Sequence, residues 1–160
     1  MAWTDSRVKR SMITDHFAGT AVFDFNAPSD TYRLPLFNNT VVPDKDATSA
    51  NSAYNAGTWL IAQEVIDTLN TNWIAKGPAI TTMTVTNPGA GIMMVDCDDI
   101  AAAGNVTLNT FFGAAPFNDT KTTPVADPIV CFNYFGGTQT VTNNLFTAQV
   151  STLGLFRGTV

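Results

Sequence analysis

Hydrophobic and polar residues alternate along much of the chain with the two-residue period of half-buried β-strands. Residues 31–37 place Tyr32, Leu34 and Leu36 on one face, although Pro35 favours an edge or a bulge there. Similar strand-like runs lie at residues 20–26, 79–86, 91–97, 105–112, 128–135 and 153–160. The pattern predicts about eight short antiparallel strands, which is typical of a β-sandwich or jelly roll.

Short turn signals separate these runs. Asn87-Pro88-Gly89 predicts a turn between two of them. Asn143-Asn144 suits the left-handed positions of a type I′ turn, so residues 138–150 are predicted to form a tight hairpin. Residues 38–57 form a long polar loop, and loops of this length are usually functional or locally packed.

One segment, residues 58–69, leaves helix and strand open as alternatives. Leu60, Ile61, Val65 and Leu69 roughly fit the spacing of a helix, whereas the β-branched residues favour a strand. We therefore predict an all-β chain with an antiparallel, jelly-roll-like sandwich and at most one short helix.

Residues 1–20 differ from the rest of the chain in pattern and charge. They show no clean period, and residues 1–10 carry Arg7, Lys9 and Arg10 against Asp5, a charge of +2, while the remainder carries −7. We predict an extended N-terminal arm over residues 1–20 and a single β-sandwich domain over residues 21–160. The arm either docks on something negative or is simply solvated.

Composition narrows the class of protein. The 160 residues are 45% hydrophobic and only 13% charged, with 24 Thr, 14 Asn and a single Glu, which excludes wholesale disorder and disfavours a helical protein. The net charge of −5 argues against general nucleic-acid binding. Apolar stretches are interrupted by Gly, Thr and Asn, so we expect no membrane span.

Few residues belong to patterns that catalyse reactions or bind metals or phosphates. The only histidine, His16, lies in the polar arm, where a solvated side chain is the ordinary case. The acidic run Asp96-Cys97-Asp98-Asp99 lacks the spacing of an EF-hand loop and fits the capped end of a strand. The glycine pairs do not match a phosphate-binding loop. We predict no catalytic residue, no metal site and no cofactor, and we do not expect an enzyme.

The N-terminus has no apolar core after its charges, so we expect no signal peptide and synthesis in a cytoplasm. Cys97 and Cys131 do not form a disulfide framework, and reduced thiols are the expectation in that compartment.

Several short motifs match one known group of proteins. They are a Leu-x-Leu-[Tyr/Phe] strand at residues 34–37, a Pro-Asp-x-Asp-Ala loop at 43–47, an Ala-Tyr pair at 53–54 and a late hairpin ending near Gly-x-Phe at 141–156. The flanking runs LPLFNNTVVPDKDATSANSAYNAG, VDCDDI and PIVCFNYFGGTQTVTNNLFTAQVSTLGLFRG share this character. Over residues 31–160 the chain resembles small virion proteins of tailed bacteriophages, and the arm lies outside the resemblance.

The resemblance implies a virion structural protein, above all a capsid decoration (cement) protein on the surface of the phage head. It implies as partners the major capsid protein and copies of the chain itself, in a homotrimer or dimer, with no nucleic acid, no membrane and no small-molecule ligand. It transfers no catalytic residue to this sequence. In this interpretation residues 1–20 are extended and lie on a neighbouring subunit, where main-chain hydrogen bonds anchor them.

The residues expected at partner contacts are the large and basic side chains of the arm and two aromatic side chains further along: Trp3, Arg7, Lys9, Arg10, His16, Phe17, Tyr54 and Trp59. One alternative is a tail or fibre-attachment virion protein whose β-sandwich binds host glycans through Tyr54, Trp59 or Trp73. Another is an unrelated β-sandwich binding module.

Overall fold

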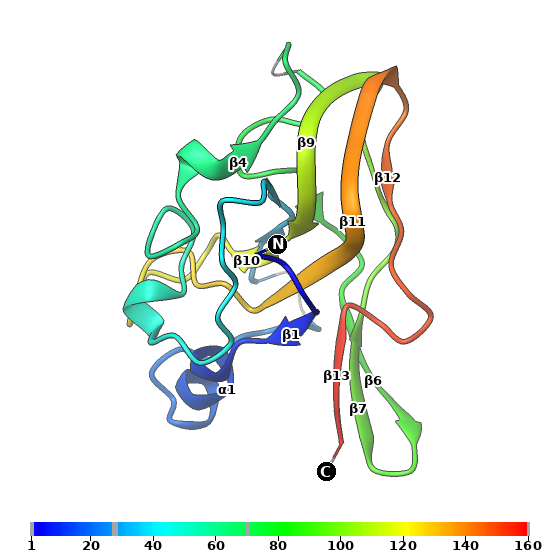
Figure 1. Cartoon of the computed structure of the whole chain (residues 1–160). Coiled ribbons are helices and arrows are strands. Elements are labelled where there is room, and N and C mark those ends of the chain that lie inside the picture. The colour runs from blue at the N-terminus through cyan, green and yellow to red at the C-terminus, as the bar shows by residue number, and fades with distance from the viewer. Residues whose placement is uncertain (1, 27–28, 70, 160) are drawn as a thin grey trace.

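The computed structural model describes residues 2–26, 29–69 and 71–159. In this part of the chain there is one α-helix, α1 (Arg10–Phe17), and two 3-10 turns, η1 (Ser49–Asn51) and η2 (Ile61–Gln63). All other regular structure is strand, and every strand pair is antiparallel. The predicted all-β class with at most one short helix is therefore confirmed (Figure 1).

The largest sheet has five strands and contains the longest ones. Its order is β1 (Arg7–Val8), β11 (Cys131–Asn144), β9 (Val106–Ala114), β3 (Leu36–Phe37) and β4 (Glu64–Val65). β9 and β11 run side by side as a curved ribbon (Figure 1). Their register shifts three times after Tyr134, and such bulges bend a ribbon and increase its twist.

Three smaller sheets complete the architecture. Their orders are β10 (Phe117–Asn118), β2 (Tyr32–Arg33), β5 (Ala79–Ile80); β12 (Thr147–Ala148), β8 (Ile100–Ala101); and β13 (Phe156–Thr159), β7 (Ile92–Asp96), β6 (Thr84–Gly89). The sheet β13-β7-β6 extends away from the rest of the molecule beside α1 (Figure 1). Ala90 and Gly91 both have positive φ and form the two-residue turn from β6 to β7, as a type I′ turn requires.

The structure confirms some of the predicted strands and turns and contradicts others. Strands occur within residues 91–97, 105–112 and 153–160 as predicted, and Leu34 and Pro35 separate β2 from β3. Residues 20–26 contain no strand. The turn predicted at residues 87–89 is wrong, because β6 continues through Gly89.

The hairpin predicted for residues 138–150 is also wrong. β11 continues to Asn144 and pairs with β9, and the following strand β12 pairs with β8 instead. Asn143 has the positive φ of 44° that the prediction requires, but it lies within β11 rather than in a turn. Partner choice follows burial, since Ala148 and Ile100 pair where both side chains enter the core.

Residues 58–69, for which the sequence leaves helix and strand open, contain no α-helix. η2 is followed by β4, in which Val65 is buried and pairs with Leu36 of β3. The helix lies in the arm instead, as α1. Its one buried residue is Met12, so contact with the body of the protein stabilises a segment with little apolar periodicity of its own.

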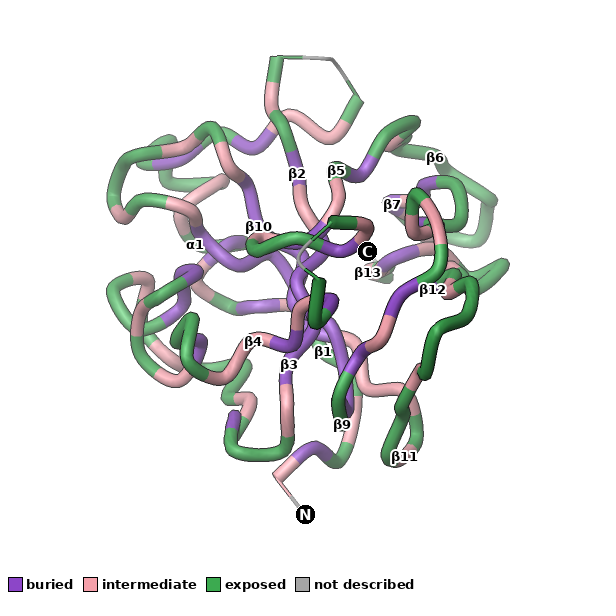
Figure 2. Tube along the Cα trace, turned by 90° about the horizontal axis from the view of Figure 1, so that it is seen from above, coloured by how far each residue is buried: buried purple, intermediate pink, exposed green. Residues whose placement is uncertain are grey.

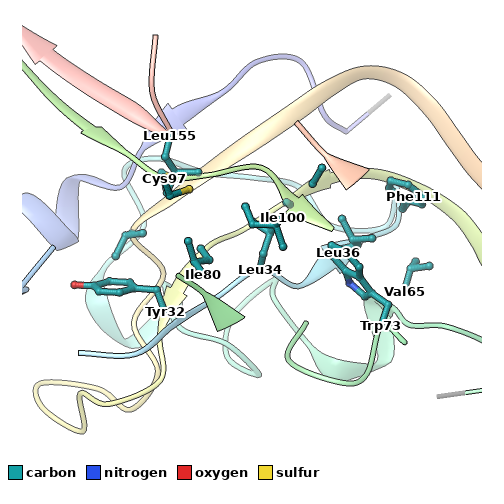
Figure 3. Close-up of a cluster of buried hydrophobic side chains, with 14 of the residues drawn as sticks. Tyr32, Leu34, Leu36, Val65, Trp73, Ile80, Cys97, Ile100, Phe111 and Leu155 are labelled. Carbon is teal, nitrogen blue, oxygen red and sulfur yellow. The ribbon is translucent and has the colours of Figure 1, made fainter. Parts of the chain in front are cut away.

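Buried side chains form two clusters. The larger one includes Tyr32, Leu34, Leu36, Ile80, Cys97 and Ile100 and lies between the sheets (Figure 3). The smaller one is aromatic and includes Trp3, Phe37, Trp59, Phe117 and Phe132. Seen from above, buried positions gather at the centre of the molecule and exposed positions follow the outer loops (Figure 2).

The arm packs on the body of its own chain rather than projecting from it. Trp3 is 0% exposed, its indole contacts Trp59 and Phe132 edge-on, and its Nε1–H donates to the Asn38 carbonyl over 3.0 Å. Val8 pairs with Cys131, and the Lys9 N–H donates to the Val130 carbonyl. This arrangement corrects the prediction that residues 1–20 are extended and lie on a neighbouring subunit.

The docking of Trp3 predicts an effect of Gly113→Ala in β9. A Cβ at this position would overlap the Trp3 ring and the Asn133 carbonyl oxygen. We expect Gly113→Ala to lower the free energy of unfolding by about 1–3 kcal/mol, as overpacking of a filled core does, measured by urea denaturation. Gly137→Ala in β11 is the matched control, because its Cβ meets nothing within 4 Å. Equal stability of the two variants would contradict the docked position of Trp3.

Candidate functional site

Most charged groups are used in contacts within the chain. Lys76 Nζ lies 2.5 Å from Asp119 Oδ1 and 3.0 Å from Asp127 Oδ2, and Arg33 Nε lies 2.6 Å from Asp119 Oδ2. Partial burial alone would raise the pKa of Asp119, but hydrogen bonds to Lys76 and Arg33 outweigh it and lower that pKa. The four side chains connect β2 with the loops that carry Lys76 and Asp127, which is a structural role.

A second buried polar contact joins Tyr54 and Glu64. The Tyr54 hydroxyl donates to Glu64 Oε2 over 2.6 Å, and burial raises the pKa values of both groups. Lys9 is also fully buried, its ammonium donates to the Asp44 carbonyl, and burial lowers its pKa. These groups fix the loop of residues 38–57 against the arm and β4.

The described residues contain no cluster of metal-ligating side chains. Nowhere in residues 2–26, 29–69 and 71–159 do three His, Cys, Asp or Glu side chains lie close enough to hold a metal ion. In the acidic run, Asp96 Oδ1 accepts from the Cys97 N–H, and Asp99 Oδ1 accepts from the Val150 N–H. Both thiols are free and buried, and burial raises the pKa of Cys97 to about 12. The single α-helix in the described part of the chain is too short to span a membrane.

The feature that stands out is an apolar groove between α1 and the sheet β13-β7-β6. The cavity measures about 320 Å³. Its helix wall is formed by Met12, Ile13 and Phe17, and its floor by Phe23 and Phe25. Its sheet wall is formed by Val85, Met93 and Phe156, and we call this cavity the apolar groove.

The floor of the apolar groove consists of packed aromatic rings, while its rim is open. Phe25 stacks on Phe23 and Tyr32 at centroid distances of 6.1 and 5.2 Å, and Phe156 meets Phe25 edge-on at 5.5 Å. At the rim, Phe17 is 84% exposed and Met93 45% exposed. Contiguous exposed apolar area of this kind usually marks an interaction site.

A second cavity of about 280 Å³ continues the apolar groove towards β1 and β11. The two cavities share Val8, Phe156 and Arg157 as lining residues. β13 pairs with β7 on one side, and its other edge has no strand partner among the described residues. In Figure 1, β13 is the strand of its sheet that lies nearest to α1, so this open edge borders the apolar groove.

Four of the predicted contact residues are buried in their own chain. Trp3, Lys9 and Trp59 are 0% exposed, and Tyr54 is buried as well. None of them presents its side chain at the surface of the single chain, so the structure offers no support for the predicted partner contacts at these four positions. Trp73 is buried too, so the three rings expected to bind a glycan are all covered.

The other four predicted residues lie nearer the surface. Phe17 and His16 line the apolar groove, and Arg7 lines the adjoining cavity. His16 Nδ1 accepts a hydrogen bond from the Phe23 N–H over 3.1 Å, so the imidazole holds the floor of the groove in place. Arg10 is exposed and pairs with Asp46.

Sequence reasoning missed the sheet wall, namely Val85, Met93 and Phe156. These residues are far apart in the sequence, and their alternation predicts strands without telling which strand faces α1. The helix wall had a weak signal, because Ile13 and Phe17 are four residues apart, as on one face of a helix.

In comparisons with known protein families, curated proteins and solved structures, no match to the chain was found. The functional argument therefore rests on the residues described above. Two properties carry it: most Lys and Arg side chains are paired with carboxylates of the described chain, and an apolar groove is open at its rim.

The carboxylate of Asp119 predicts a pH-dependent contribution to stability. Asp119→Asn should lower the free energy of unfolding at pH 7 by about 1–3 kcal/mol, because two charged hydrogen bonds are weakened. Since the folded-state pKa of Asp119 is lowered, its contribution is complete above the unfolded value of 3.8 and is lost as pH falls through the folded value. The free energies of unfolding of wild type and Asp119→Asn should therefore converge as the pH is lowered. Urea denaturation at a series of pH values measures this convergence.

Asp98→Asn is the matched control, because Asp98 is exposed and its carboxylate makes no ion pair with the described residues. A difference between wild type and Asp119→Asn that stays constant down to acid pH would contradict a lowered pKa.

Proposed function

We propose that the chain is a structural protein of tailed-bacteriophage particles, a capsid decoration protein that binds to subunits of the head. The observation that carries the proposal is the apolar groove, which is open at the rim and has a floor of packed aromatic rings. The resemblance of residues 31–160 to small virion proteins supplies the setting. Binding, rather than catalysis, is the chemistry that such a surface offers.

The fold supports the same proposal. A protein that works outside cells needs a stiff fold, and here strands, two core clusters and internal ion pairs provide it. In the homotrimer or dimer that the resemblance implies, several grooves bind together, and avidity strengthens what is a modest contact for each chain.

The proposal is tested in particles of the virus whose genome encodes the chain. Quantitative mass spectrometry should find on the order of hundreds of copies per particle, as a symmetric shell requires, and antibody labelling should place them on the head. A few copies at the tail, or absence from purified particles, would overturn the proposal.

The groove itself is tested with Met93→Lys, which places a charge on its sheet wall. We expect the variant to fold normally, because Met93 is 45% exposed, and to bind particles that lack the wild-type chain about tenfold more weakly. Leu145→Lys is the matched control, because Leu145 is 69% exposed and does not line the groove. Equal binding of the two variants in a sedimentation assay would show that attachment uses another surface.

A further inference from the structure

We infer that the apolar groove binds an extended segment of another polypeptide, which adds as a strand to the open edge of β13 and carries a carboxylate that pairs with Arg157. The inference rests on the proposed function in that it names the partner of the same groove. Three independent features of the groove lead to it.

The first feature is the strand edge. β13 has four residues, hydrogen-bonds to β7 on one side, and has no strand partner on its other side within the described part of the chain. An unpaired edge presents backbone N–H and C=O groups that pair readily with an added strand. Strand addition uses these groups for affinity and uses adjacent pockets for alternate side chains.

The second feature is the pair of cavities along that edge. The apolar groove and the adjoining cavity meet at Val8, Phe156 and Arg157, so they form one path from α1 to β1. A strand rises about 3.3 Å per residue and points every second side chain to the same face. Every second side chain of a bound strand would therefore face the groove. The aromatic floor at Phe23 and Phe25 favours apolar side chains at these alternate positions.

The third feature is charge. Six of the eight Lys and Arg residues form ion pairs with carboxylates of the same chain, and the buried ammonium of Lys9 donates to a carbonyl. Arg157 is the exception: its side chain is exposed and makes no ion pair with the described residues. Arg157 lines both cavities, and an unpaired cation at this position favours a carboxylate on the bound segment.

The same charge argues against a second copy of this chain as the occupant. Antiparallel pairing of β13 with β13 of a copy would bring two Arg157 side chains to nearby cross-strand positions, where like charges repel. A different polypeptide with an acidic residue has no such conflict.

The test is a selection of random ten-residue linear peptides on the full-length protein. The enriched peptides should show apolar residues at alternate positions together with Asp or Glu. One enriched peptide is then titrated by fluorescence anisotropy against wild type, Arg157→Glu and Met93→Lys. Each variant should bind about tenfold more weakly, the loss expected for a like charge or a charge buried against an apolar surface.

Two controls separate strand addition from other modes of binding. Replacing the acidic residue of the peptide by Lys should restore its affinity for Arg157→Glu and weaken its affinity for wild type. Peptide binding should also slow hydrogen exchange of the β13 amides, since they gain hydrogen-bond partners. Lys45→Glu, at an exposed cation that does not line either cavity, should bind as wild type does.

Several outcomes would overturn the inference. They are a selection without enrichment, enriched peptides with the three-to-four-residue spacing of a helix, full affinity in Met93→Lys, and a dimer of the chain itself that Met93→Lys dissociates. The proposed function fails separately, by absence from particles. If the chain binds peptides but is absent from particles, the inference about the groove stands and the proposed function fails. If the chain attaches to the head but binds no peptide, the proposed function stands and the inference about the groove fails.

Discussion

The burial of Trp3 against Trp59 and Phe132 fixes the path of the N-terminal residues, and the rest of the functional surface depends on that path. From Trp3 the chain passes along β11 as β1, the Lys9 and Arg10 N–H groups donate to the carbonyls of Val130 and Lys45, and α1 follows immediately. A segment with weak helical periodicity becomes a helix here because it is held at its start and buries Met12 on the body.

The apolar groove is a consequence of this docking. α1 is placed beside the sheet β13-β7-β6 but does not cover it, so Phe17 and Met93 remain exposed across an aromatic floor. Six of the eight Lys and Arg residues are paired with carboxylates within the described part of the chain, whereas Arg157, which lines the groove, makes no such pair. The arm thus forms one wall of the groove that we propose as the binding surface.

How much the sequence predicts depends on whether a feature is local. The alternation of residues 105–112 reports half-burial directly, and β9 forms there. The choice of partner strand is not local: Asn143 has the positive φ that a turn would use, yet β11 continues through it and pairs with β9 up to Asn144. Trp3 and Lys9 look like solvated arm residues, and only contacts more than thirty residues away bury them. The groove combines α1, Phe25, Met93 and Arg157, so no single segment of the sequence shows it.

Hydrogen exchange of the wild-type chain tests the central claim most directly. The sample is one that sedimentation velocity shows to be monomeric. If the arm docks on its own body, peptide fragments that cover β1 and α1 exchange slowly, with protection approaching that of β9. If residues 2–17 exchange at the rate of an unstructured peptide while β9 stays protected, the arm is free in the isolated chain, and the groove that it builds does not exist there.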